Sequence, residues 1–173
     1  MPVLTFSVIQ MKRPQYLGEV KLQNSNAMSE DLQQAIIRQH PKAVKQVKGW
    51  ALKFKGKNDR DTAFRVWRFM RKNFTYKRDK PEKQRIFLPS AALHFRKSGF
   101  DCKSFATFAA AIFSSLGIPN GYFFTSYRNR AIPSHIYNYI RLSNGSTLPV
   151  DGCYRFFGIQ KTPTFVKNIT LKK

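Results

Sequence analysis

The stretch GFDCKSFATFAAAIFSSLGIP, residues 99–119, contains the clearest helix pattern in the chain. Its apolar residues recur at positions 105, 108, 109, 112, 113 and 116, which is the spacing of one broad helix face. Gly117 and the Ile118-Pro119 pair end that pattern. We therefore predict a helix from Cys102 to Leu116, and its wide apolar face indicates a central place in the fold.

Two helices are predicted far upstream, on either side of a proline. Residues 29–39 favour a helix that His40-Pro41 ends, because a residue before proline avoids the helical region. Pro41 then suits the first turn of a second helix, whose apolar stripe runs to Phe54 and which Gly56 ends.

A third helix is expected to start at Asp59 or Asp61, which we expect to cap it, and to reach about Asn73. Residues 77–84 are expected to form a charged loop, and residues 90–97 a short helix. At the N-terminus, residues 2–11 favour an extended arm or strand.

Strand patterns follow the central helix, at residues 122–127, 135–142 and 147–151. Asn144-Gly145 lies between the last two strands and is the strongest short hairpin signal. Residues 165–171 form either a final edge strand or a tail that docks elsewhere. Helices followed by antiparallel strands predict an α+β fold, with the N-terminal helices and the central Cys-bearing helix packed on an antiparallel sheet.

Composition limits the class of protein. The chain has 173 residues, enough for one domain, and 42% are hydrophobic. The 25 aromatic residues (16 Phe, 7 Tyr, 2 Trp) exclude a disordered or collagen-like chain. Two cysteines are too few for a disulfide framework and suit a reducing compartment. No apolar run of 18 residues and no signal peptide is present, so we expect no membrane partner and a place in the cytoplasm or within a virion.

Three residues could act together as a catalytic group. Cys102 starts the central helix, where the helix dipole favours a thiolate. His135 starts one predicted strand and Asp151 ends the strand hairpinned to it, so Asp151 could orient His135 toward the thiol. A two-residue Asn144-Gly145 turn would leave this pair out of line, so either a bulge or a four-residue loop corrects it or the three residues form a loose arrangement.

Four segments in order resemble the transglutaminase-like superfamily of papain-type folds. They are WRFMRKNFTY at 67–76, DCKS at 101–104 in a helix that ends with LGIP at 116–119, SHIYN at 134–138, and PVD at 149–151. The resemblance covers about residues 61–158 and is compatible with a phage-encoded member. We expect an extended arm over 1–26, the transglutaminase-like domain over 27–158 and an extended tail over 159–173.

The resemblance implies specific roles and an activity. Cys102 matches the nucleophile, His135 the base and Asp151 the orienting carboxylate. The implied activity is that of a cysteine hydrolase or acyltransferase acting on a peptide or protein amide through an acyl-thioester, without cofactor or metal. Two departures are Phe100, inserted between Gly99 and Asp101, and Lys103, where the family commonly has an acidic residue.

Other polar residues have weaker assignments. Arg96 and His94 are candidates for a side-chain oxyanion donor, by proximity in the sequence only. Cys153 is expected to be a partly buried small apolar residue rather than a second nucleophile. His40 and His94 otherwise suit surface or packing positions.

The charge supports other functions. Lys and Arg number 31 and Asp and Glu 9, a net charge of +22, and 16 of the basic residues lie between positions 42 and 85. These residues favour contact with nucleic-acid phosphates or with an acidic protein surface. The alternatives are therefore a non-enzymatic basic component of a phage or other nucleoprotein assembly, with neighbouring subunits, and a nucleic-acid-backbone-binding module. The candidate binding residues are Lys42, Lys45, Lys48, Lys53, Arg65, Arg68, Arg71 and Lys72.

Overall fold

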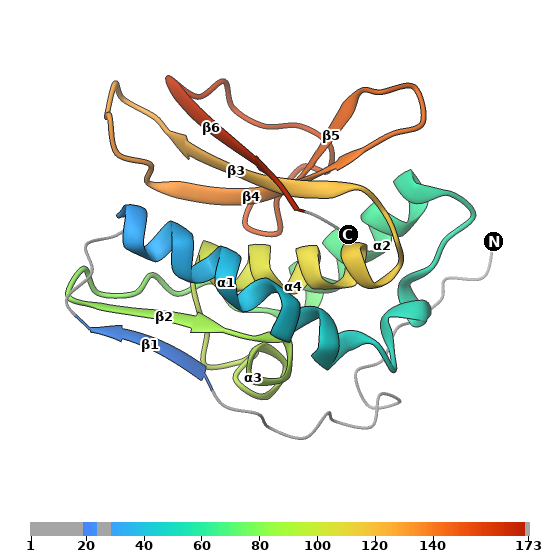
Figure 1. The fold of residues 1–173 in the computed structure, drawn as a ribbon, viewed down its shortest axis with the longest axis horizontal. Coiled ribbons are helices and arrows are strands. Elements are labelled where there is room, and N and C mark those ends of the chain that lie inside the picture. The colour runs from blue at the N-terminus through green and yellow to red at the C-terminus, as the bar shows by residue number, and fades with distance from the viewer. Residues whose placement is uncertain (1–18, 24–28, 172–173) are drawn as a thin grey trace.

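A four-stranded antiparallel sheet lies on a layer of helices in the computed structural model, which describes residues 19–23 and 29–171 (Figure 1). The sheet has the order β5-β4-β3-β6 and consists of β3 (Asn120–Ser126), β4 (His135–Arg141), β5 (Thr147–Val150) and β6 (Phe165–Thr170). The α+β prediction is confirmed. Within the described ranges, the helices are all too short or too polar to cross a bilayer.

The central helix is α4 (Cys102–Ser115), as predicted. Asp101 caps it, because its carboxylate accepts a hydrogen bond from the backbone N–H of Lys103 at 3.2 Å. Every residue from Cys102 to Phe113 is buried, since α4 packs between α1 and the sheet. The wide apolar face of the sequence therefore corresponds to a helix surrounded by the rest of the fold.

One helix, α1 (Glu30–Val47), replaces the two predicted around Pro41, and only a short 3-10 turn, η2 (Ala51–Phe54), follows it. The predicted break at His40 is wrong. Buried residues lie on both sides of Pro41, among them Ile36 and Ala43, and His40 itself is buried and hydrogen-bonded to Ser114 Oγ of α4 at 2.9 Å. Packing along α4 thus outweighs the local preference of a residue before proline.

The third predicted helix is α2 (Asp59–Asn73), but its cap is one residue earlier than expected. Asn58 Oδ1 accepts from the backbone N–H of Asp61 at 2.8 Å. Asp61 in turn accepts from the backbone N–H of Lys57 at 3.0 Å, so the two side chains satisfy donors on both sides of the helix start. The short helix predicted near residue 90 is α3 (Pro89–His94).

Two strands were not predicted. β1 (Glu19–Gln23) and β2 (Lys83–Phe87) pair antiparallel in a separate two-stranded sheet. β2 begins inside the segment that was expected to be a charged loop. Its buried residues Gln84 and Ile86 alternate with charged neighbours, and these charges hide the strand in the sequence. β1 lies within the expected N-terminal arm, and the strand expected at residues 2–11 falls outside the described residues.

The loop of the β4–β5 hairpin is longer than two residues, and this extra length brings His135 and Asp151 to the same face of the sheet. Leu142 N donates to Ser146 O and Gly145 N donates to Leu142 O, both at 2.9 Å, and Gly145 has φ +82°. This is a three-residue loop with a left-handed glycine. Asn138 consequently pairs with Val150, so the next residue, Asp151, faces the same side of the sheet as Tyr137 and His135.

The last strand, β6, pairs antiparallel with β3 on the side away from β4. The edge-strand alternative for residues 165–171 is therefore the one observed. Residues 159–173, expected as a tail, contribute this strand to the main sheet.

Gly99 is required where α3 leads into α4. It has φ +85°, and a Cβ there would lie 2.8 Å from Lys77 Cβ and 3.2 Å from Thr75 O. This close approach lets Phe100 pair with the Thr75–Lys77 backbone, which places Tyr76 beside the start of α4.

A Gly99→Ala variant is expected to lose about 1–3 kcal/mol of unfolding free energy, because alanine resists this φ and clashes with Lys77. Urea denaturation measures the loss. Gly117→Ala is the matched control: its φ is +73°, but nothing lies within 4 Å of its Cβ, so it should lose less. Equal losses would show that the contact with Lys77 is unimportant.

Candidate active site

His135 and Asp151 lie side by side, as the sequence predicted. His135 Nε2 is 2.6 Å from Asp151 Oδ2. The Asp151 carboxylate is buried and has two further partners: Oδ1 accepts from the backbone N–H of Cys153 at 2.8 Å, and Oδ2 accepts from Gln160 Nε2. These contacts fix the orientation of the carboxylate and of the imidazole that it holds.

Cys102 lies at the start of α4, close to His135. The thiol lies near enough to His135 to favour the protonated imidazole. Because Nε2 is bonded to Asp151, Nδ1 is the imidazole nitrogen that remains for the thiol. Cys102 is 5% exposed and lines a cavity of about 460 Å³, while His135 lines a neighbouring cavity of about 630 Å³.

The two cavities form one cleft, because four residues line both. These are Tyr76, Arg78, Arg130 and Ser134. The structure thus brings together the three residues that the sequence singled out, although β4, the residue after β5 and α4 contribute one each. A substrate in this cleft would lie next to both the thiol and the imidazole.

The surroundings of the site shift two pKa values in ways that matter for chemistry. Burial lowers the pKa of His135, but the hydrogen bond with Asp151 and the nearby Cys102 thiol outweigh it and raise this pKa above its usual 6.5. Burial and the nearby charge of Asp151 raise the pKa of Cys153 well above its usual 9.0. Cys153 therefore keeps its proton and is a poor nucleophile, which fits the packing role expected for it.

Tyr76 is a site residue to which the sequence analysis assigned no role. It lines both cavities, and its ring packs on Phe105 with centroids 6.3 Å apart. Tyr76 is half exposed, and its partial burial, together with the charges of Cys102 and Cys153, raises its pKa further above neutral pH. The phenol is therefore protonated and can donate a hydrogen bond. The segment Phe74-Thr75-Tyr76, quoted above for the family resemblance, is where this residue could have been noticed. Phe74 is buried in the core, and Tyr76 lies two positions later.

The two oxyanion candidates suggested by sequence proximity lie elsewhere. Arg96 Nη1 donates to Leu93 O at 3.0 Å, and His94 packs against Phe95. Neither residue lines either of the two cavities. Gln160 is the other unforeseen site residue, and its loop position beyond the expected domain gave no signal.

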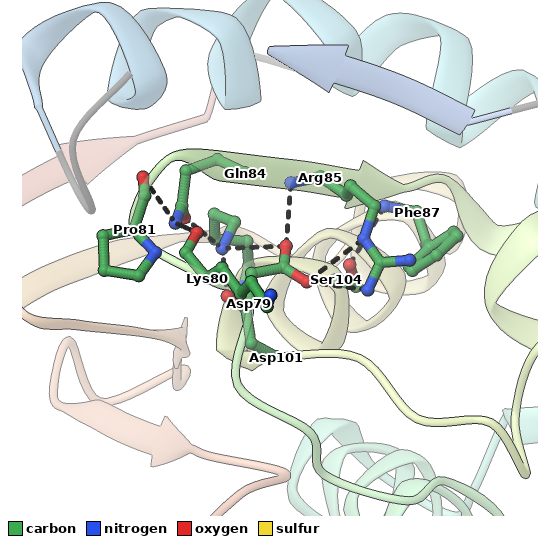
Figure 2. Close-up of polar contacts among 9 residues, drawn as sticks. Asp79, Lys80, Pro81, Gln84, Arg85, Phe87, Asp101 and Ser104 are labelled. Carbon is green, nitrogen blue, oxygen red and sulfur yellow. Dashed lines mark hydrogen bonds and ion pairs between the residues drawn. The ribbon is translucent and has the colours of Figure 1, made fainter. Parts of the chain in front are cut away.

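A buried ion cluster is built around Lys103, the residue after Cys102. Figure 2 labels its partners Asp79, Gln84 and Asp101. The Lys103 ammonium contacts Asp101 Oδ2, lies 3.7 Å from Asp79 Oδ2 and donates to Gln84 Oε1 at 2.8 Å. Asp79 also holds Arg85, whose Nη2 is 2.9 Å from Oδ1. The departure at position 103 therefore has a structural purpose: it ties the first turn of α4 to β2 and the loop before it.

Most of the basic residues predicted to bind a polyanion are exposed on α1, η2 and α2; these are Lys42, Lys45, Lys48, Lys53, Arg68, Arg71 and Lys72. Arg65 is partly exposed and pairs with Asp61 at 3.1 Å. Arg71 Nη1 lies 3.5 Å from the carbonyl oxygens of Gly152 and Cys153, next to Asp151. Binding of nucleic acid or of an acidic partner by this set stays a prediction.

Comparison with solved structures gives two similar chains. A crystal structure described as "a putative protease from Parabacteroides distasonis ATCC 8503" matches with a TM-score of 0.55 and 11% identity, over 79% of this chain and 29% of that one. A crystal structure of a TGase matches with a TM-score of 0.43 and 16% identity, over 79% of this chain and 36% of that one. The chain therefore spans only part of each structure, and at this identity the first match shows a shared fold alone.

A family model gives the clearest relationship. A search among curated proteins found no match. The model described as the transglutaminase-like superfamily matches residues 48–152, which is more than half of the chain and includes Cys102, His135 and Asp151. Together with the observed fold, this match shows that the chain belongs to the transglutaminase-like superfamily.

Proposed function

We propose that this protein is a cysteine hydrolase or acyltransferase that acts on an amide, with Cys102 as nucleophile, His135 as base and Asp151 as the residue that orients it. The 2.6 Å hydrogen bond between His135 Nε2 and a buried Asp151, with the Cys102 thiol near the same imidazole, is the observation that carries this proposal. A thiol, a base and an orienting carboxylate in this order are the parts that nucleophilic acyl transfer needs.

The reaction uses each group in turn. The Cys102 sulfur attacks the carbonyl carbon of the amide, and the thiol proton passes to His135. The C–N bond then breaks, and His135 returns that proton to the leaving amine, which leaves an acyl-thioester on Cys102. Water or a second amine attacks the thioester, gives a proton to His135 and displaces the thiol, which takes the proton back.

The negative charge on the tetrahedral intermediate needs donors at the start of α4. The helix N-terminus supplies a positive dipole end at Cys102. We assign the side-chain donor to Tyr76, which lines the same cavity as Cys102 and keeps its phenol proton.

Selective alkylation tests the activated thiol without a known substrate. At pH 6, iodoacetamide is expected to label Cys102 before Cys153, because the pKa of Cys153 is raised and that thiol stays protonated. Replacing His135 with alanine should slow Cys102 labelling by about 10²-fold, a typical contribution of a positioned base. Peptide mass spectrometry reads both cysteines, and Cys153 serves as the internal control.

Labelling of both cysteines at one rate, unaffected by His135→Ala, would refute the proposal. Turnover is tested separately by incubating amide-bearing peptides with the protein and measuring the mass of the intact chain by mass spectrometry. An adduct that is lost in Cys102→Ala identifies the acyl-thioester. Its decay in water, compared with decay in the presence of a primary amine, separates hydrolysis from acyl transfer.

A further inference from the structure

Four exposed cations surround the cleft that holds Cys102 and His135. Arg78 and Arg130 line both of its cavities, whereas Arg128 and Lys161 line the cavity of His135. They come from three separate loops, so the cleft is bordered by positive charge on several sides. None of them is among the eight candidate binding residues named from the sequence, although Arg78 lies in the basic segment 42–85.

The acidic residues that line the cleft do not neutralise these cations. They are buried and already paired: Asp79 with Arg85 and Lys103, Asp101 with Lys103, and Asp151 with His135 and Gln160. Across the described residues, none of the four rim cations forms an ion pair. The charge facing a substrate is therefore positive and uncompensated.

The loop between β3 and β4 holds two of the cations in a fixed conformation. Arg128 and Asn129 both have left-handed backbones, with φ +69° and +53°, which non-glycine residues rarely adopt. The conformation is secured by a hydrogen bond from Asn129 N to Thr164 Oγ1 at 3.1 Å and by one from Ser126 Oγ to Arg130 O. Backbone strain of this kind persists where surrounding contacts enforce it.

The other two cations follow residues that are tied to the site. Arg78 comes directly after Lys77, whose backbone N–H donates to Phe100 O at 2.9 Å, just before the start of α4. Lys161 comes directly after Gln160, which donates to Asp151. Each of these two cations is thus attached to the chain next to a residue that is anchored at the site.

We infer that the amide substrate is an acidic peptide segment, with Asp or Glu side chains close to the amide that Cys102 attacks; this inference rests on the proposed function. Carboxylates pair well with arginine, in two parallel hydrogen bonds, and a cleft lined with one sign of charge concentrates ligands of the other. A peptide is favoured over nucleic acid because the thiol at the centre of these cations needs a carbonyl carbon, which a phosphodiester backbone does not offer.

Binding to an inactive protein tests the inference separately from catalysis. In a Cys102→Ala background, a fluorescein-labelled decapeptide rich in Glu and Asp should bind at least about tenfold more tightly than its Gln and Asn counterpart at low salt. The double variant Arg128→Glu/Lys161→Glu should weaken binding of the acidic peptide by about tenfold or more. Arg38→Glu/Arg141→Glu, exposed positions outside both cavities, changes the net charge equally and should leave the affinity nearly unchanged.

The outcomes separate the two proposals. Equal affinity for the acidic and neutral peptides, or equal weakening by both double variants, would overturn the inference even if Cys102 forms an acyl-thioester. A single-stranded oligonucleotide that binds more tightly than the acidic peptide, and loses that affinity in Arg128→Glu/Lys161→Glu, would also overturn it. Charge-selective binding without any acyl-thioester in the active protein would support the acidic ligand and refute the proposed catalysis.

Discussion

An Asp151→Asn variant is expected to form its acyl-thioester about 10³–10⁴-fold more slowly than the native protein. Asparagine fills the same space, but it cannot balance the positive charge that His135 acquires when it takes the thiol proton. Its amide group can also hold the imidazole in the wrong tautomer. Single-turnover kinetics, followed by the mass of the intact chain, give the rate.

NMR titration of the His135 ring measures its pKa and provides a second test of the Asp151→Asn variant. A general loss of stability alone would not change this pKa. The native contacts raise the pKa of His135, so its protonated form is stabilised by folding. That stabilisation is complete below about pH 6.5 and is lost as the pH rises through the pKa of the folded state. In Asp151→Asn the titration should shift to lower pH, and the pH-dependent stabilisation should shrink.

Asp31→Asn, at an exposed position on α1, is the matched control and should change neither the rate nor the titration. A rate for Asp151→Asn within tenfold of the native one would show that the carboxylate does not orient His135.

The largest effect on stability is expected from Lys103→Met, at about 3–5 kcal/mol of unfolding free energy. Methionine has a similar length but leaves the buried Asp101 carboxylate without its cation (Figure 2). Asp79 is affected less, because Arg85 remains beside it. Urea denaturation at pH 7 measures the loss, and Lys97→Met, at an exposed position, should change stability by less than about 0.5 kcal/mol.

Two further measurements identify the orphaned carboxylate as the cause. The double variant Lys103→Met/Asp101→Asn should recover at least about half of the loss, because asparagine removes the charge and still caps α4. Burial raises the pKa of Asp101, and without Lys103 it should rise further, so the deficit of Lys103→Met should be smaller at pH 5 than at pH 7. A single variant within 1 kcal/mol of the native protein would contradict the argument.

The parts of the fold that the sequence predicts well are those with strong local patterns. α4 has a broad apolar face, a cap at Asp101 and a stop at Gly117, and the structure has the helix within one residue of its expected end. The strands that carry His135 and precede Asp151 follow from alternation and from the Asn-Gly turn. The proximity of Cys102, His135 and Asp151 follows because each lies at the end of such an element.

The features that the sequence did not predict depend on contacts between residues that are far apart in the chain. α1 continues through Pro41 because His40 reaches Ser114 of α4, 74 positions later. The charged residues of β2 give it the sequence pattern of a loop, and it forms a strand by pairing with β1. Gln160 meets Asp151, and Lys103 meets Asp79 and Gln84 in addition to its neighbour Asp101; the distant partners come from other elements and are not visible in the local sequence.

The three-residue loop of the β4–β5 hairpin makes the length of a remote turn part of what places Asp151 beside His135. Strand side chains alternate between faces, so adding or removing a single residue there would move Asp151 to the face away from His135 unless a new bulge compensates. A change of two residues would preserve the alternation. Among relatives in which the same histidine and aspartate are paired, the lengths of this loop should therefore differ by even numbers, although no residue of the loop lines either cavity of the site.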